Sequence, residues 1–101
     1  MASLKGTQTE KNLVKALAGE TQAAARYSYF AKKAKKEGFE QIAAVLERTS
    51  VEEDAHASRF FKLLEGGNVE VTSTFVAGGN GKTSDNLRAA ADGEREEVEV
   101  M

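Results

Sequence analysis

Three polar side chains stand where a helical pattern calls for apolar ones, and their types suit a metal site. Glu20 falls between Leu17 and Ala24 in the stripe of one helix that should face the interior. Glu53 and His56 occupy the equivalent stripe of the next helix. A carboxylate that faces a core is costly unless it is paired or bound to a cation. Three such placements on neighbouring helices predict one shared cation site.

The spacing of Glu53 and His56 indicates which kind of metal site these residues can form. Glu53 and His56 are three residues apart, so both side chains leave the same face of a helix and can reach one ion. A Glu-x-x-His pair with a lone glutamate on the facing helix is the ligand unit of di-iron carboxylate bundles. Carboxylate oxygen and imidazole ligands suit iron or manganese. The chain has no cysteine, so it lacks the thiolate ligand that would favour zinc. We expect two non-haem iron ions, with manganese or zinc as alternatives.

Each residue also has a simpler interpretation. Glu20 can lie at the edge of its stripe and reach solvent, and His56 can be a hydrogen-bonded core imidazole. Tyr27, seven residues after Glu20, either hydrogen-bonds a ligand carboxylate or is ordinary core. The coincidence of two glutamates and a histidine on two facing stripes favours the metal interpretation.

The count of histidines predicts a homodimer. The chain of 101 residues has one histidine, whereas a di-iron carboxylate site takes four carboxylates and two imidazoles. Two copies, each giving Glu20, Glu53 and His56, supply that set. An interface in which both chains use the same patch would complete the site.

Two long helices must position these residues, which makes the expected fold all-α. The first, over residues 8–37, begins with Thr7 and Glu10 spaced as in a capping box, and Gly38 suits the position just past its end. The second runs over about 39–65. Joined by so short a link, the two helices should form an antiparallel hairpin, half of a four-helix bundle.

The remainder of the chain is predicted to be less regular. A connecting segment over 66–84 leads to a short helix at about 85–92. Gly93 is expected to close that helix, and residues 94–101 are read as the start of a further one.

Composition excludes several classes of function. The chain has no cysteine, which rules out disulfides, thiolate zinc sites, iron–sulfur clusters and cysteine nucleophiles. The net charge of −2 gives no case for nucleic acid. No apolar run of about 18 residues or secretory leader is evident, so we expect a cytoplasmic protein without membrane contact. Only 7% of the residues are aromatic, and a partner chain or a metal would strengthen so thin a core.

Several segments together resemble the rubrerythrins. The resemblance runs from Leu4 to Met101 and is carried by Ala18-Gly-Glu-Thr-Gln22, by Arg26-Tyr-Ser-Tyr-Phe-Ala31, and by Glu53-x-x-His56 with the Phe-Phe-Lys-Leu-Leu-Glu-Gly-Gly that begins at Phe60. It implies a ferritin-like four-helix bundle with a non-haem di-iron site. The implied activity is that of a peroxidase, an oxidoreductase that reduces hydrogen peroxide to water with electrons from an external protein such as rubredoxin.

The resemblance also implies roles for individual residues. Glu20, Glu53 and His56 match iron ligands, and Glu94 and Glu97 match two ligands on the third helix, although a solvated helix start is the default interpretation of those two. Glu20, Glu53 and His56 are expected to be catalytic as well, and Tyr27 is expected to act with them by transferring protons, because of its position near the proposed site.

Other features depart from the family pattern. The family's fourth helix and its rubredoxin domain are missing, and Val98 stands where an aromatic residue is usual. Either the chain is a half-bundle that dimerises or it is part of a longer protein. Ferroxidase or iron-handling activity, and a structural helical dimer with a non-catalytic metal site, are the alternative functions.

Overall fold

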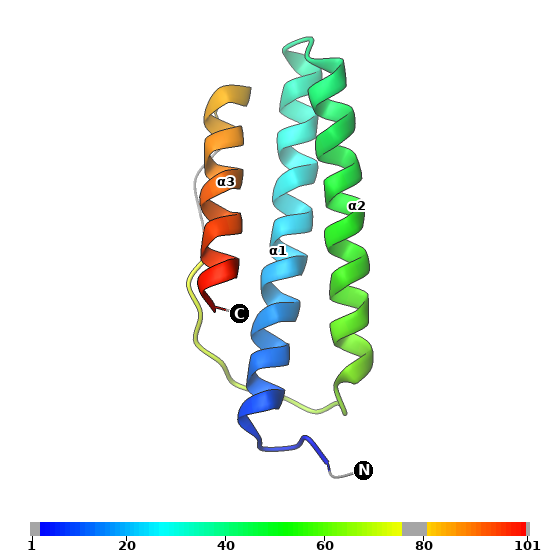
Figure 1. The fold of residues 1–101 in the computed structure, drawn as a ribbon. Helices are drawn as coiled ribbons and strands as arrows, with labels where there is room; N and C mark the ends of the chain where they lie inside the picture. Colours follow the sequence, from blue (N-terminus) through cyan, green and yellow to red (C-terminus); the bar gives the residue numbers. More distant parts are fainter. Residues whose placement is uncertain (1–2, 76–80, 101) are drawn as a thin grey trace.

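The computed structural model is an elongated helical bundle, with extents of 51 × 21 × 20 Å. It describes residues 3–75 and 81–100, and only the backbone of 92–100. The helices are α1 (Gln8–Lys36), α2 (Glu40–Leu63) and α3 (Thr83–Val100), and no strand occurs in the described ranges. α1 and α2 form an antiparallel hairpin (Figure 1), as the sequence predicts. No helix in the described ranges is both long and apolar enough to cross a membrane.

The start of α1 departs in one detail from the predicted capping box. The Thr7 hydroxyl accepts a hydrogen bond from the Glu10 backbone N–H at 3.1 Å, as expected of an N-cap. The Glu10 carboxylate, however, accepts from the Gly6 N–H at 3.0 Å, whereas a capping box would direct it to Thr7. The Thr7 N–H instead donates to the carbonyl of Leu4. Glu10 therefore fixes the chain that enters the helix.

The link between α1 and α2 is a tight turn around Gly38. This glycine has a φ of +85°, a conformation that side chains disfavour. Its N–H donates to the carbonyl of Lys35 at 3.1 Å, and the N–H of Phe39 donates to Ala34 at 2.9 Å. These two bonds form a Schellman motif, which satisfies the last carbonyls of α1 and reverses the chain. The prediction of Gly38 as the residue past the helix end is confirmed.

Small residues allow α1 and α2 to pack closely. The core is built largely from alanines, with Phe30 (1% exposed) and Tyr27 (5% exposed) as its main aromatic side chains. Their rings meet edge to face, with centroids 6.5 Å apart. Ser50 of α2 donates a hydrogen bond to the backbone carbonyl of Ala24 in α1 at 2.6 Å. This bond ties the two helices together at mid-height, where the predicted site residues lie.

α3 packs against α1, and within the described ranges its backbone does not come close to that of α2. The Thr83 N–H donates to the Glu37 carboxylate at 3.1 Å, so α3 starts at the closed end of the hairpin and runs back along α1 (Figure 1). The predicted break at Gly93 is wrong, because α3 continues through it to Val100. One glycine within a helix costs only about 1 kcal/mol relative to alanine, and no proline follows to stop the helix.

The connection between α2 and α3 has no helix or strand from Leu64 to Phe75. It crosses the open end of the hairpin and turns up beside α1 (Figure 1). The rest of the predicted connecting segment, at 76–80, lies outside the described residues.

The pH dependence of stability tests the Glu10 contact. Its hydrogen bond from the Gly6 N–H, together with Lys5 Nζ at 3.0 Å, lowers the pKa of this carboxyl below its ordinary value of 4.5. A lowered pKa stabilises the fold above about pH 4.5, and this stabilisation is lost as pH falls through the folded-state pKa. Glu10→Gln should therefore unfold at lower urea than the wild type at pH 7, and the gap should close in acid. Glu70→Gln, at an exposed site, is the control. A gap that stays constant with pH would contradict this assignment.

Candidate metal centre

The structure brings together three residues that the sequence singles out. One potential ligand atom from each of Glu20, Glu53 and His56 lies within 4.8 Å of the others. His56 Nδ1 is 3.5 Å from Glu20 Oε2. No other group of three histidine or acidic side chains comes together in this way within the part of the chain that the structure describes. The cluster is thus a specific feature of the hairpin.

The hairpin geometry places the cluster at its middle. Glu20 lies near the centre of α1, and Glu53 and His56 lie near the centre of α2. Ser50, one turn before Glu53, holds α2 to α1 through the carbonyl of Ala24, one turn after Glu20. Sequence reasoning missed Ser50 as a positioning residue. Its place on the same helix face as Glu53 is the signal that would have found it.

The two carboxylates are buried, which makes their charge the central problem of the site. Glu20 and Glu53 are each 8% exposed, whereas the His56 side chain is 47% exposed. Glu53 Oε2 is buried and accepts no hydrogen bond from the part of the chain that the structure describes. Burying a carboxylate oxygen without a donor or a counter-ion is costly. A cation bound between these side chains would remove that cost.

The donor set fits a divalent metal ion. Two carboxylates and one neutral imidazole offer oxygen and nitrogen ligands, and their formal charge balances one such ion. Three donors leave positions open on an ion that prefers four to six ligands. The His56 side chain is half-exposed, so the cluster borders solvent on at least one side, and further ligands or a small substrate could complete the coordination of a bound ion.

Tyr27 lies in the core cluster with its ring against Phe30, which agrees with its interpretation as a core residue and leaves a role in proton transfer untested. Glu94 and Glu97 belong to α3. Their side chains lie outside the described residues, so the structure does not test them as ligands.

Comparison with known proteins identifies a family that this chain resembles. The family model for rubrerythrin matches residues 11–101. A rubrerythrin of Porphyromonas gingivalis is 58% identical over 95 residues, which cover 94% of this chain and 48% of that protein. A rubrerythrin of Nitratidesulfovibrio vulgaris is 50% identical over 101 residues, covering 100% of this chain and 53% of the relative. Nigerythrin from the same organism is 37% identical over 94 residues, covering 92% of this chain and 46% of that protein.

The chain spans about half the length of the curated relatives it matches. The family match covers nearly all of α1 and the whole of α2 and α3, including the three clustered residues. On these matches, the chain belongs to the rubrerythrin family.

Proposed function

We propose that this chain contributes to a non-haem di-iron site in an oxidoreductase that reduces hydrogen peroxide to water, with electrons from another protein. The observation that carries the proposal is the cluster of two buried carboxylates and one imidazole, in a chain of the rubrerythrin family. Reducing one peroxide to two waters takes two electrons and two protons. The site must therefore accept electrons and deliver protons.

The clustered residues would bind and orient the metal. Glu20 and Glu53 would supply oxygen ligands from the two helices, and His56 an imidazole nitrogen. Bound iron would supply the electrons and the positive charge that favours cleavage of the O–O bond. A carboxylate of the cluster or the Tyr27 hydroxyl would pass protons, because both lie on the inward side of the hairpin. Ala24 and Ala57, each buried one turn from a clustered glutamate, would help to keep bulk water from the buried side.

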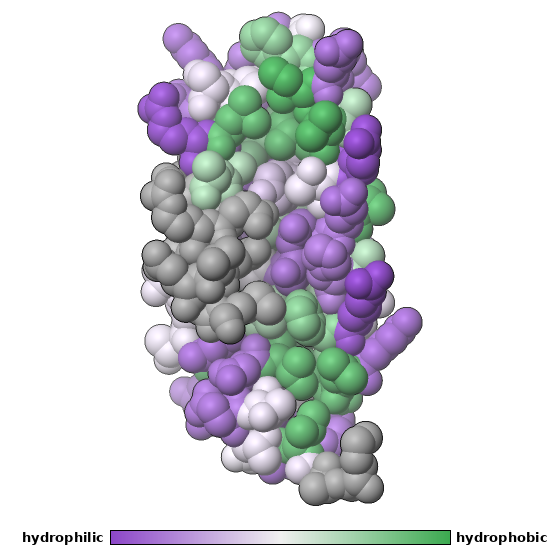
Figure 2. All heavy atoms as spheres, in the orientation of Figure 1, coloured by the Kyte–Doolittle hydropathy of each residue, from purple (hydrophilic) through white to green (hydrophobic). Residues whose placement is uncertain are grey.

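Further ligands are required, and we propose two sources. Glu94 and Glu97 are one source, on α3, which packs along α1. A second copy of the chain is the other, since each copy has one histidine. Exposed apolar surface on this chain supports the proposal that a second copy covers it. Figure 2 shows two hydrophobic areas separated by a hydrophilic band on one face. Val45 and Leu63 of α2 are 54% and 57% exposed.

Adjacent glutamates on α2 provide a matched test of metal binding. Ferrous iron at about 100 times its dissociation constant should stabilise the wild-type protein by about 2.7 kcal/mol. Glu53→Gln should lose most of this gain, because it removes a ligand charge, and the exposed Glu52→Gln should keep it. Anaerobic thermal unfolding with and without iron is the measurement. An equal shift in both variants would show that iron binds elsewhere.

Native mass spectrometry with metal analysis tests the second copy. If two chains share one site, we expect two irons per dimer and their loss in His56→Ala, since each chain supplies its one imidazole. Two irons bound to a monomer would exclude the shared site. They would leave the ligand role of the clustered residues standing, provided that His56→Ala still lowered the iron content.

The choice of oxidant tests the reaction itself. We expect anaerobically loaded ferrous protein to be oxidised much faster by hydrogen peroxide than by dioxygen, measured by stopped-flow absorbance. Glu53→Gln should slow the reaction, whereas Glu52→Gln should not. Preferential reaction with dioxygen would favour ferroxidase activity. Unchanged rates in Glu53→Gln would favour a structural dimer whose metal site is not catalytic.

A further inference from the structure

Charge is strongly segregated on α1. The helix contains two carboxylates, Glu10 and Glu20, and both are buried. It also carries six lysines: Lys11, Lys15, Lys32, Lys33, Lys35 and Lys36. None of these lysines forms an ion pair with any residue that the structure describes. The charged residues that α1 itself presents to solvent are therefore all positive, in a chain whose net charge is −2, and Glu70 of the connecting segment lies beside Lys11 and Lys15 at one end of the helix.

This arrangement works against the stability of the helix. Lys11 and Lys15 are four residues apart, as are Lys32 and Lys36, and like charges at that spacing repel. The helix dipole favours lysines in the last turn but disfavours them near the start, where Lys11 lies. Helix stability alone thus explains only part of the cluster.

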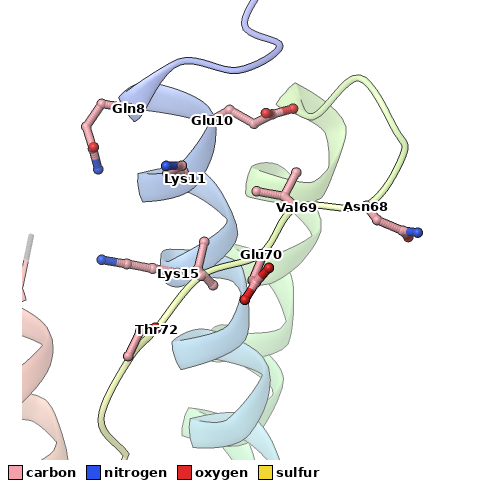
Figure 3. Close-up of a pocket in the computed structure, with 9 residues that line it drawn as sticks. Gln8, Glu10, Lys11, Lys15, Asn68, Val69, Glu70 and Thr72 are labelled. Carbon is pink, nitrogen blue, oxygen red and sulfur yellow. The ribbon is translucent and has the colours of Figure 1, made fainter.

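An exposed aromatic ring accompanies the lysines. Tyr29 is 59% exposed, and Lys32 Nζ lies 5.8 Å from the centre of its ring. At the other end of the helix, Lys15 extends away from α2 (Figure 3). Tyrosine is enriched in protein interfaces because its ring buries well while its hydroxyl stays hydrated. We call Tyr29 and the six lysines the α1 lysine face.

We propose that the α1 lysine face docks an acidic electron-carrier protein. This inference rests on the proposed function, in which two carrier molecules would each lose one electron for every peroxide reduced to two waters. Complementary charge would speed their encounter and orient the carrier. An extended nucleic acid fits less well, because the chain as a whole carries a net charge of −2.

The position of the face suits electron delivery. Glu20 lies on the same helix, on the side turned toward α2. Lys15 precedes it by five residues, which is about 8 Å along the axis and about 140° around it. A carrier on the lysine face is thus separated from the carboxylate cluster by about one helix diameter, 10 Å.

Binding and turnover can be tested separately, with rubredoxin as the acidic probe. The binding arm uses zinc-substituted rubredoxin and metal-free protein, followed by ¹⁵N–¹H NMR shifts. We expect the shifts to map to α1 lysines and Tyr29, and the dissociation constant to rise about tenfold between low and physiological salt. Lys32→Glu/Lys36→Glu should weaken binding by a further tenfold or more. The control Arg48→Glu/Lys62→Glu changes the net charge equally on the exposed side of α2.

The outcomes separate this inference from the proposed function. Equal weakening by both double variants, shifts confined to α2, or tighter binding of a DNA oligonucleotide at the lysine face would each overturn it. In the turnover arm, Lys32→Glu/Lys36→Glu should slow peroxide reduction driven by rubredoxin but not by dithionite. Slowing with both reductants would overturn the docking role. Absence of peroxide reduction with either reductant in the wild type, alongside binding at the lysine face, would count against the proposed function alone.

Discussion

The main physical constraint on this structure is the burial of two carboxylates inside a helical hairpin, because their charge must be neutralised there. Glu20 and Glu53 approach each other from facing helices, both are nearly excluded from water, and the half-exposed His56 completes the group. Burial strengthens the repulsion between such charges, and only a proton, a hydrogen bond or a cation can offset it. The rest of the hairpin can be understood as the frame that holds these side chains close enough to share one ion.

Hydrogen bonds at both ends of α1 hold that frame in place. The Schellman motif at Gly38 sets the reversal of the chain, and Thr7 with Glu10 fixes the entry. Alanines between the helices let the backbones approach, and the bond from Ser50 to Ala24 holds the register one turn from the cluster. A metal site needs this precision, since small displacements of a ligand weaken coordination.

The hairpin and the cluster were predictable because local patterns determine them. Glu20 and the Glu53–His56 pair interrupt apolar stripes that repeat every 3.6 residues, as in a helix. Gly38 follows the end of the first helix, where the chain takes a left-handed backbone conformation that glycine adopts most easily. α3 was harder to predict. α3 continues through Gly93 because one glycine inside a helix lowers its stability only slightly, although glycine is also the residue that commonly ends a helix. The position of α3 beside α1 depends on the hydrogen bond from the Thr83 N–H to the Glu37 carboxylate, and these residues are 46 positions apart in the sequence. The hydrogen bond from the Gly6 N–H to the Glu10 carboxylate was likewise hard to predict, because it depends on the conformation of the residues before α1.

The central claim, that a cation neutralises the buried carboxylates, has a direct test. Crystals of the protein loaded anaerobically with ferrous iron can be measured at wavelengths on either side of the iron absorption edge. The anomalous difference map should show iron within bonding distance of carboxylate oxygens from both α1 and α2 and of the His56 imidazole. Fully loaded crystals with iron only at other positions, and those carboxylates still close together, would contradict it.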